Sequence, residues 1–254
     1  MLNLRSIPAA RAAAADGDRP VKRQSWIGPS VALVAASALL AACHRPADKA
    51  RAPAAAEPTV ERAGPVRWNA AAGDFELGGK PLKTVKLWTF DGSTEGFTAM
   101  GSRITPAPGQ GIAVTMADPT IRSPRGLNVP GGQYPLVLVR LTRTAPAAAW
   151  DGALYYSTVN HPETINFLGK PLFGADPHVG ETTTLVYDMS RQAAGAPDWT
   201  QSTIDQIRLD VEDKPGGAFL IHQIAIAESP DPAALGPVAA AAPAAAPKTP
   251  APKS

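Results

Sequence analysis

Apolar and polar residues alternate over short stretches in the middle of the chain, which is the pattern of β-strands. The pattern is clearest in seven stretches, at residues 85–90, 111–116, 135–143, 153–158, 182–187, 204–211 and 218–226. Clusters of glycine, proline, asparagine and aspartate separate these stretches, as expected of turns. Residues 135–143 are almost continuously apolar, which predicts a central buried strand. No stretch has a convincing helical period, so the pattern predicts an all-β fold.

The short strands favour a β-sandwich of the jelly-roll type, which we place at residues 66–228. Most of the aromatic residues lie between Phe75 and Phe219, so we expect the buried core in the same region. Residues 68–79 fit either an extra edge strand or a linker, and we assign them to the domain as an edge segment that begins near Val66.

Alanine and proline dominate the segments on either side of this domain, at residues 43–65 and 229–254. Neither segment shows apolar periodicity, and the repeated prolines block helix growth. We therefore predict a flexible tether before the domain and a disordered tail after it.

The first 42 residues have the layout of a secretory signal. A short basic stretch at residues 21–25 precedes an uncharged apolar run at residues 26–42. The run ends in Leu40-Ala41-Ala42-Cys43, which resembles the lipobox of bacterial lipoprotein precursors. The resemblance implies that residues 1–42 are removed and that Cys43 is acylated, which would anchor the chain to a lipid bilayer. The alternatives are an ordinary signal peptide with an incidental cysteine, or an uncleaved membrane helix.

The lipoprotein resemblance also implies a location. The anchored chain is expected in the cell envelope, and in the outer membrane if the organism has one, because His44 stands where aspartate would favour retention in the inner membrane. The formal charge of +2 then loses its meaning, since residues 1–42 carry five of the 24 basic residues and two of the 22 acidic ones. The remaining chain has a formal charge of −1 and no basic stripe, so we expect no nucleic-acid partner.

Cys43 is the single cysteine of the chain, which excludes an internal disulfide and any zinc site built from several thiolates. A metal site at His161, Glu163 and His178 is an alternative, but their spacing follows no recognised motif. We therefore expect no metal and no cofactor. No catalytic set is present either, so we expect that the protein is not an enzyme.

Several short motifs follow one another in an order that points to a family. They are Trp88-Thr89-Phe90-Asp91, Glu95-Gly96-Phe97, Val137-Leu138-Val139-Arg140-Leu141, Asp198-Trp199 and Ile207-Arg208-Leu209-Asp210. Their order over residues 84–228 resembles galactose-binding-like jelly rolls of the carbohydrate-binding-module type. The resemblance implies non-catalytic binding of carbohydrate or of cell-envelope glycan. The alternative is a structural envelope lipoprotein that contacts other envelope proteins and has no sugar ligand.

Sugar sites combine an aromatic ring with side chains that make directed hydrogen bonds to hydroxyls. Because alternate residues of a strand share a face, Arg208 and Asp210 are expected to point the same way. We predict that they line one concave sheet together with Arg140 and Tyr156, with Trp150 at its rim. The alternative is that Arg208 and Asp210 form a structural ion pair, and that Tyr156 and Trp150 belong to the core.

Overall fold

The computed structural model describes residues 60–146, 149–230 and 235. Strands dominate this part of the chain, and each of the seven predicted stretches overlaps one of them. The strands are β1 (Val60–Glu61), β2 (Val66–Asn69), β3 (Asp74–Leu77), β4 (Lys80–Pro81), β5 (Thr84–Trp88), β6 (Thr98–Ala107), β7 (Gly111–Arg122), β8 (Val129–Pro130), β9 (Leu136–Ala145), β10 (Trp150–Thr158), β11 (Leu168–Gly169), β12 (Glu181–Asp188), β13 (Thr203–Glu212) and β14 (Ala218–Ala227). A 3-10 helix over Met189–Arg191 and a single turn of α-helix, α1 (Asp198–Gln201), complete the described elements.

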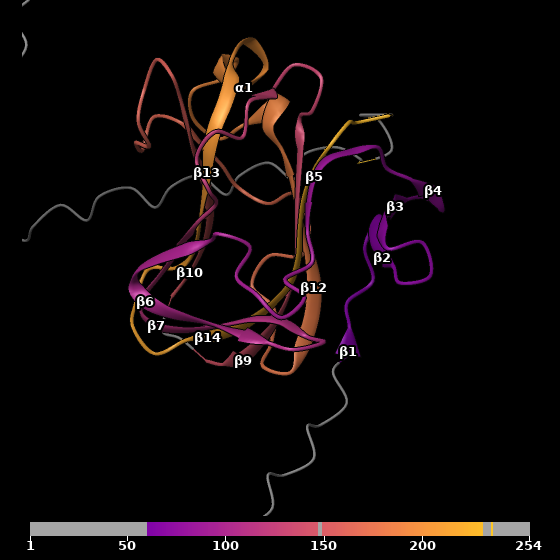
Figure 1. Ribbon diagram of the computed structural model, residues 1–254, viewed down its shortest axis with the longest axis vertical. Coiled ribbons are helices and arrows are strands. Elements are labelled where there is room, and N and C mark those ends of the chain that lie inside the picture. Colours follow the sequence, from indigo (N-terminus) through magenta and orange to yellow (C-terminus); the bar gives the residue numbers. More distant parts are fainter. Residues whose placement is uncertain (1–59, 147–148, 231–234, 236–254) are drawn as a thin grey trace, which may run out of the picture. The chain divides into compact units, whose positions relative to one another are not determined.

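Eleven strands form one hydrogen-bonded sheet that curls into two layers. The order β1-β12-β9-β14 forms one layer, with β5 beside the end of β14, and β13, β10 and β11 form the other. Strand β7 joins the layers, because residues 112–115 pair with β14 and residues 120–122 pair with β13. In Figure 1, β5 and β12 stand on one side and β10 and β13 on the other, while β6 and β7 cross between them. The all-β sandwich predicted from the sequence is confirmed.

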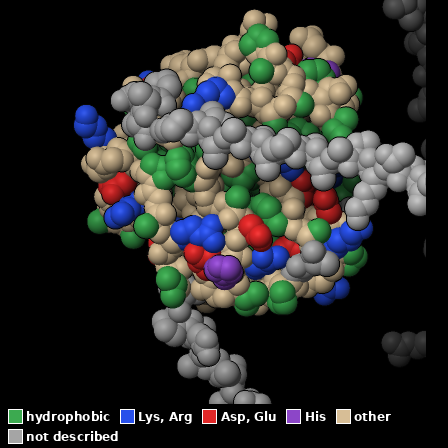
Figure 2. Space-filling view, turned by 180° about the vertical axis from the view of Figure 1, so that it is seen from behind, with side chains coloured by type: hydrophobic (Ala, Val, Ile, Leu, Met, Phe, Trp, Pro, Cys, Tyr) green, Lys and Arg blue, Asp and Glu red, His purple; other side chains and the backbone are tan. Residues whose placement is uncertain are grey.

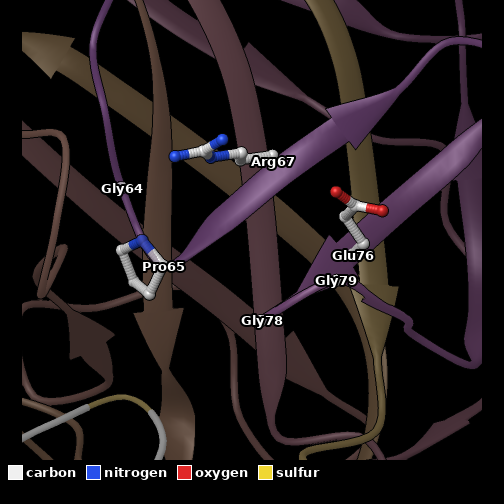
Figure 3. A pocket seen from close by; sticks show the side chains of 6 residues that line it. All are labelled: Gly64, Pro65, Arg67, Glu76, Gly78 and Gly79. Carbon is white, nitrogen blue, oxygen red and sulfur yellow. The ribbon is translucent and has the colours of Figure 1, made fainter.

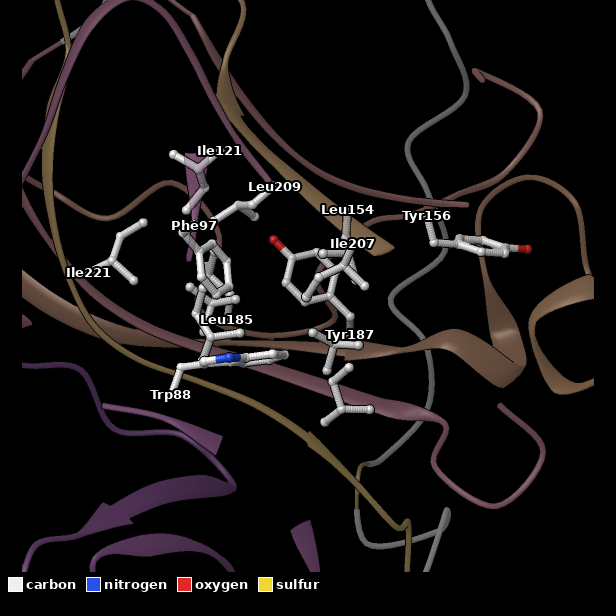
Figure 4. Packing of buried hydrophobic residues seen from close by; sticks show 14 of the residues in the cluster. Trp88, Phe97, Ile121, Leu154, Tyr156, Leu185, Tyr187, Ile207, Leu209 and Ile221 are labelled. Atoms are coloured by element: carbon white, nitrogen blue, oxygen red, sulfur yellow. The ribbon is translucent and has the colours of Figure 1, made fainter. Parts of the chain in front are cut away.

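The main core fills the space between the two layers. On β9 the inward side chains are Val137, Val139 and Leu141, all fully buried. Tyr187 of β12 points toward Leu154 and Ile207 of the opposite layer, as Figure 4 shows. Alternation along each strand therefore sends one set of side chains into this core and the other set to the outer faces.

A three-stranded sheet, β2-β3-β4, covers part of the outer face of the β9 layer. Phe75 and Leu77 of this sheet pack with Leu136 and Leu138 of β9 in a second, smaller core. The first half of β9 is thus buried on both faces, as its nearly continuous apolar sequence predicts. Residues 68–79, expected as an edge segment of the sandwich, belong instead to this separate sheet.

Several strands were not predicted from the sequence, among them the two-residue strands β4, β8 and β11. Strand β6 has few apolar residues and is mostly exposed, so its pattern is weak. Strand β1 lies at residues 60–61, inside the predicted tether, and pairs in parallel with the edge of β12. Strand β1 thus falls within the last residues that the sequence assigns to the tether.

The predicted signal peptide, Cys43, the first part of the tether and almost all of the tail lie outside the described residues. Within residues 60–146, 149–230 and 235, no helix is long and apolar enough to cross a membrane.

Candidate functional site

The predicted ligand-binding residues do not share one surface. Arg140 lies on the outer face of the β9 layer, whereas Arg208 and Asp210 lie on the outer face of β13 in the other layer. Tyr156 is fully buried in the main core, and its hydroxyl donates a hydrogen bond to Asp198 at 2.9 Å. The prediction that these four residues line one sheet face is therefore wrong, because Arg140 lies in the other layer and Tyr156 faces the core from β10.

Trp150 is half-buried and packs against the main core. Its ring centroid lies 6.2 Å from that of Phe219. The ring also covers Gly152, where an added Cβ atom would lie 2.6 Å from the indole. Trp150 thus has mainly a packing role, which is the alternative that the sequence left open.

Arg208 and Asp210 form a structural network of charges. Arg208 lies over the ring of Tyr155, 4.0 Å from its centroid, and pairs with Asp210 at 3.0 Å and with Glu163 at 3.4 Å. Glu163 also pairs with Arg122 at 3.0 Å. The aromatic beside Arg208 is thus Tyr155, its cross-strand neighbour, rather than Tyr156. On the face of the molecule drawn in Figure 2, basic and acidic side chains likewise lie next to one another.

A pocket of about 440 Å³ lies around Arg140. Five parts of the chain build it: the end of β2, the loop after β5, the β6–β7 hairpin, β9 and β14. Its lining consists of Trp68, Ala70, Thr89, Asp91, Gly109, Gln110, Gly111, Arg140, His222 and Gln223. We refer to this hollow as the Arg140 pocket.

Trp68 supplies the aromatic surface of the Arg140 pocket. The ring is half-buried and rests edge-on against Phe75, with 5.1 Å between the ring centroids. Phe75 is fully buried in the second core, so it holds the indole in place. The lining thus combines a fixed aromatic ring with polar side chains.

Arg140 and Gln223 are paired across β9 and β14. The Nη1 atom of Arg140 donates to Oε1 of Gln223 at 3.3 Å, which orients both side chains. The remaining donors of Arg140 bind Glu61 of β1, with 3.1 Å between Nε and Oε1 and 2.6 Å between Nη2 and Oε2.

His222 lines the pocket as a neutral ring. Its Nδ1 atom lies 2.7 Å from the carbonyl oxygen of Gln110, which accepts, so Nδ1 carries the proton. Its Nε2 atom accepts from the hydroxyl of Thr142 at 2.7 Å. Burial, followed by the nearby charge of Arg140, lowers the pKa of His222 below its ordinary value of 6.5. The ring therefore adds polarity to the pocket without adding charge at pH 7.

Arg140 is the single residue of the predicted set that lines this pocket. Sequence reasoning missed Trp68 because its strand was taken as an edge segment of the sandwich. It missed Gln223 and His222 because the register of β9 against β14 contains a bulge between Ile221 and Gln223. The alternation of side chains along β14 indicates which residues share a face, but it does not show which strand lies beside β14.

A second hollow, of about 380 Å³, lies at the small sheet and is drawn in Figure 3. Arg67 and Glu76 project from neighbouring strands beside glycine and proline backbone, and none of its lining residues is aromatic. It therefore lacks the stacking surface that the Arg140 pocket has.

The alternative metal site is not assembled. His161 bonds Asp198 at 2.9 Å, whereas Glu163 bonds Arg122 and Arg208. His178 is exposed in another loop, where its backbone N–H donates to Glu181. Among the described residues, no group of three or more histidine, cysteine, aspartate or glutamate side chains is placed to hold a metal ion.

Comparison with known proteins gives a likeness to solved structures only at the level of the fold. No family model matches the chain, and no curated protein matches it. One solved structure that aligns with it is the CBM22-1 xylan-binding domain of Xyn10C from Paenibacillus barcinonensis, at 16% sequence identity and a TM-score of 0.40. The alignment covers 58% of this chain and 97% of that domain. A likeness of this size does not show what the present chain binds.

Proposed function

We propose that the protein is a non-catalytic glycan-binding protein and that the Arg140 pocket is its binding site. The observation that carries the proposal is the fixed ring of Trp68 in one pocket with Arg140, Gln223 and His222. Aromatic rings stack on the C–H faces of sugars, while amide, guanidinium and imidazole groups bond their hydroxyls.

The size and polarity of the pocket support this assignment. A volume of about 440 Å³ lies in the range of about 300–1,000 Å³ that small-molecule sites occupy. Its lining offers donors from Arg140 and Gln110 and acceptors from Asp91 and Gln223. A sugar hydroxyl both donates and accepts, so a mixed lining of this kind suits it.

The test is a glycan array with the full-length protein, followed by calorimetry on any glycan that binds. We expect Trp68→Ala to weaken binding by about 2 kcal/mol or more, as the loss of a hot-spot side chain does. Gln110→Ala should disturb the fold less than Trp68→Ala, because the Gln110 side chain is exposed and the bond to His222 comes from its backbone carbonyl. Gln201→Ala, exposed on α1 outside the pocket, is the matched control and should bind as the unchanged protein does. Full binding by Trp68→Ala protein that is still folded contradicts the proposal.

We also propose that Cys43 is the acylated N-terminus of the mature chain and attaches this domain to the cell envelope. The support is the lipobox-like sequence Leu40-Ala41-Ala42-Cys43 after an uncharged apolar run. We expect Cys43→Ser to move the protein from the membrane fraction to the soluble fraction and to abolish labelling by a palmitate analogue. A Cys43→Ser protein that stays in the membrane fraction contradicts the anchor, and Ser190→Ala, a change of one exposed side chain, is the handling control.

A further inference from the structure

The chain holds one of its own carboxylates on the Arg140 pocket. Residues Val60–Arg62, here called the edge strap, run along the free edge of β12. The strap pairs in parallel with this edge, Val60 with Glu181 and Glu61 with Thr182, and its backbone bonds include Val60 N to Gly180 O at 3.3 Å and Arg62 N to Thr182 O at 2.7 Å. The side chain of Val60 is 69% exposed, so it contributes little to the attachment. The ion pairs of Arg62 and Glu61 add to the backbone pairing.

Arg62 is the firm attachment of the edge strap. Its guanidinium donates to both carboxylate oxygens of Glu181, from Nε to Oε1 at 2.7 Å and from Nη2 to Oε2 at 2.6 Å. It also donates to the carbonyl oxygen of Ala175 at 2.6 Å. These contacts hold the backbone of the strap independently of what Glu61 does.

Glu61 is the looser contact. Its side chain is 48% exposed while it pairs with Arg140. Exposed ion pairs contribute only about 0–1 kcal/mol, because water solvates the separated charges well. A competing anion can therefore replace Glu61 without detaching the strap.

The geometry of Arg140 specifies the anion. Its Nη1 atom is engaged by Gln223, and the two remaining directions, from Nε and Nη2, bind the two oxygens of the Glu61 carboxylate. A planar pair of oxygens matches this fork. Among the described residues that line the pocket, Arg140 is the single Lys or Arg side chain, so a carboxylate on a bound sugar is the group that fits it.

We propose that the Arg140 pocket selects glycans that carry uronic acids, and that Glu61 occupies the carboxylate position until such a ligand displaces it. The inference rests on the proposed glycan-binding function and deepens it. Trp68 stacks on the sugar ring, Arg140 binds its carboxylate, and the freed Glu61 turns into solvent while Arg62 keeps the strap on β12. Asp91, the exposed acid of the pocket lining, keeps its contact with solvent.

The experiment uses the full-length protein and three matched pairs of ligands. Oligomers of galacturonic, glucuronic and mannuronic acid are each compared with their carboxyl-reduced forms by calorimetry in low salt. We expect at least one uronate to bind more tightly than its reduced form. Glu61→Gln removes the competitor and should tighten uronate binding about two- to fivefold, with no change for the reduced form. Arg140→Gln should weaken uronate binding at least about tenfold and abolish the preference.

Two matched variants control for net charge. Glu228→Gln removes an acid that pairs with Lys83 outside the pocket, and Arg125→Gln removes an exposed base that pairs with Asp205. Both should bind as the unchanged protein does. If Glu228→Gln tightens binding as much as Glu61→Gln, long-range charge explains the effect and the inference is overturned.

The two levels of the hypothesis fail in different ways. If reduced and acidic oligomers bind equally and Glu61→Gln changes neither, while Trp68→Ala weakens the binding of both, the carboxylate site is wrong and the glycan pocket stands. If no oligomer and no array glycan binds the unchanged protein or Glu61→Gln, both proposals are wrong. Thermal unfolding confirms in each case that the variant is folded.

Discussion

A single side chain, His222, connects the pocket lining to the stability of the β9 layer. It links the carbonyl of Gln110, in the β6–β7 hairpin, to the hydroxyl of Thr142 on β9. Thr142 lies 2.6 Å from Thr182 of β12, so the hydroxyls extend this chain across the layer. The ring has to be neutral for Nε2 to accept, because a protonated imidazole donates from both nitrogens.

This arrangement predicts a loss of stability in mild acid. Folding lowers the pKa of His222 below 6.5, so the unfolded chain binds the proton more tightly than the folded one. The free energy of unfolding should therefore fall as the pH drops from about 6.5 through the lowered pKa. His222→Gln should cost about 1–2 kcal/mol at pH 7.5 and should flatten the pH dependence in this window. Denaturant unfolding between pH 5 and 8 measures both, with the exposed His178→Gln as control; an unchanged slope contradicts the assignment.

Among the elements, β10 shows how a bulge places an aromatic side chain. The register against β13 shifts between Trp150 and Ala153, and Gly152 between them has φ +63°. A left-handed residue lets the strand bend so that the indole folds back over the backbone of Gly152. Trp150 consequently packs against the main core beside Phe219.

Gly152→Ala tests this description of the bulge. The left-handed conformation destabilises alanine by about 1 kcal/mol relative to glycine. The added Cβ atom would also lie 2.6 Å from the indole of Trp150. We expect a total loss of about 2–4 kcal/mol, because the indole has to leave its packed position. Gly126→Ala is the matched control, since Gly126 has φ +74° with no atom within 4 Å of an added Cβ. Equal losses in the two variants, measured by thermal unfolding with tryptophan fluorescence, would mean that Trp150 does not pack there.

At the scale of the whole molecule, the strands of the two layers could be predicted from the sequence, whereas the Arg140 pocket could not. Apolar side chains form a nearly continuous run in β9 and alternate with polar ones in β13, and both patterns are visible without a structure. The Arg140 pocket depends instead on which strands are neighbours in the curled sheet and on where the small sheet docks. Those contacts join residues as distant as Trp68 and Gln223, and no local pattern encodes them.

The two layers are also joined by a buried ion pair at one end of the sandwich. Arg143 of β9 reaches Glu212 of β13 at 2.8 Å, and the side chain of Glu212 has no exposed area. Arg143 also binds Asp176 at 2.9 Å. Burial raises the pKa of Glu212, although Arg143 opposes the shift. Folding therefore favours the protonated acid, and the contribution of Glu212 to stability falls as the pH rises from 4.5 through its raised pKa.

Removing the base from this pair should be more damaging than removing both partners. Arg143→Met leaves a carboxylate buried between the layers, and we expect it to cost about 3–5 kcal/mol at pH 7. The loss should shrink as the pH is lowered toward 4.5, where Glu212 takes up a proton. The double variant Arg143→Met with Glu212→Leu should recover most of the loss, since apolar replacements of buried pairs are often neutral. Denaturant unfolding of the single and double variants at pH 7 and pH 5 decides the matter. If the double variant is as unstable as the sum of its single changes, the pair is not coupled, and the layers are held at this end by packing alone.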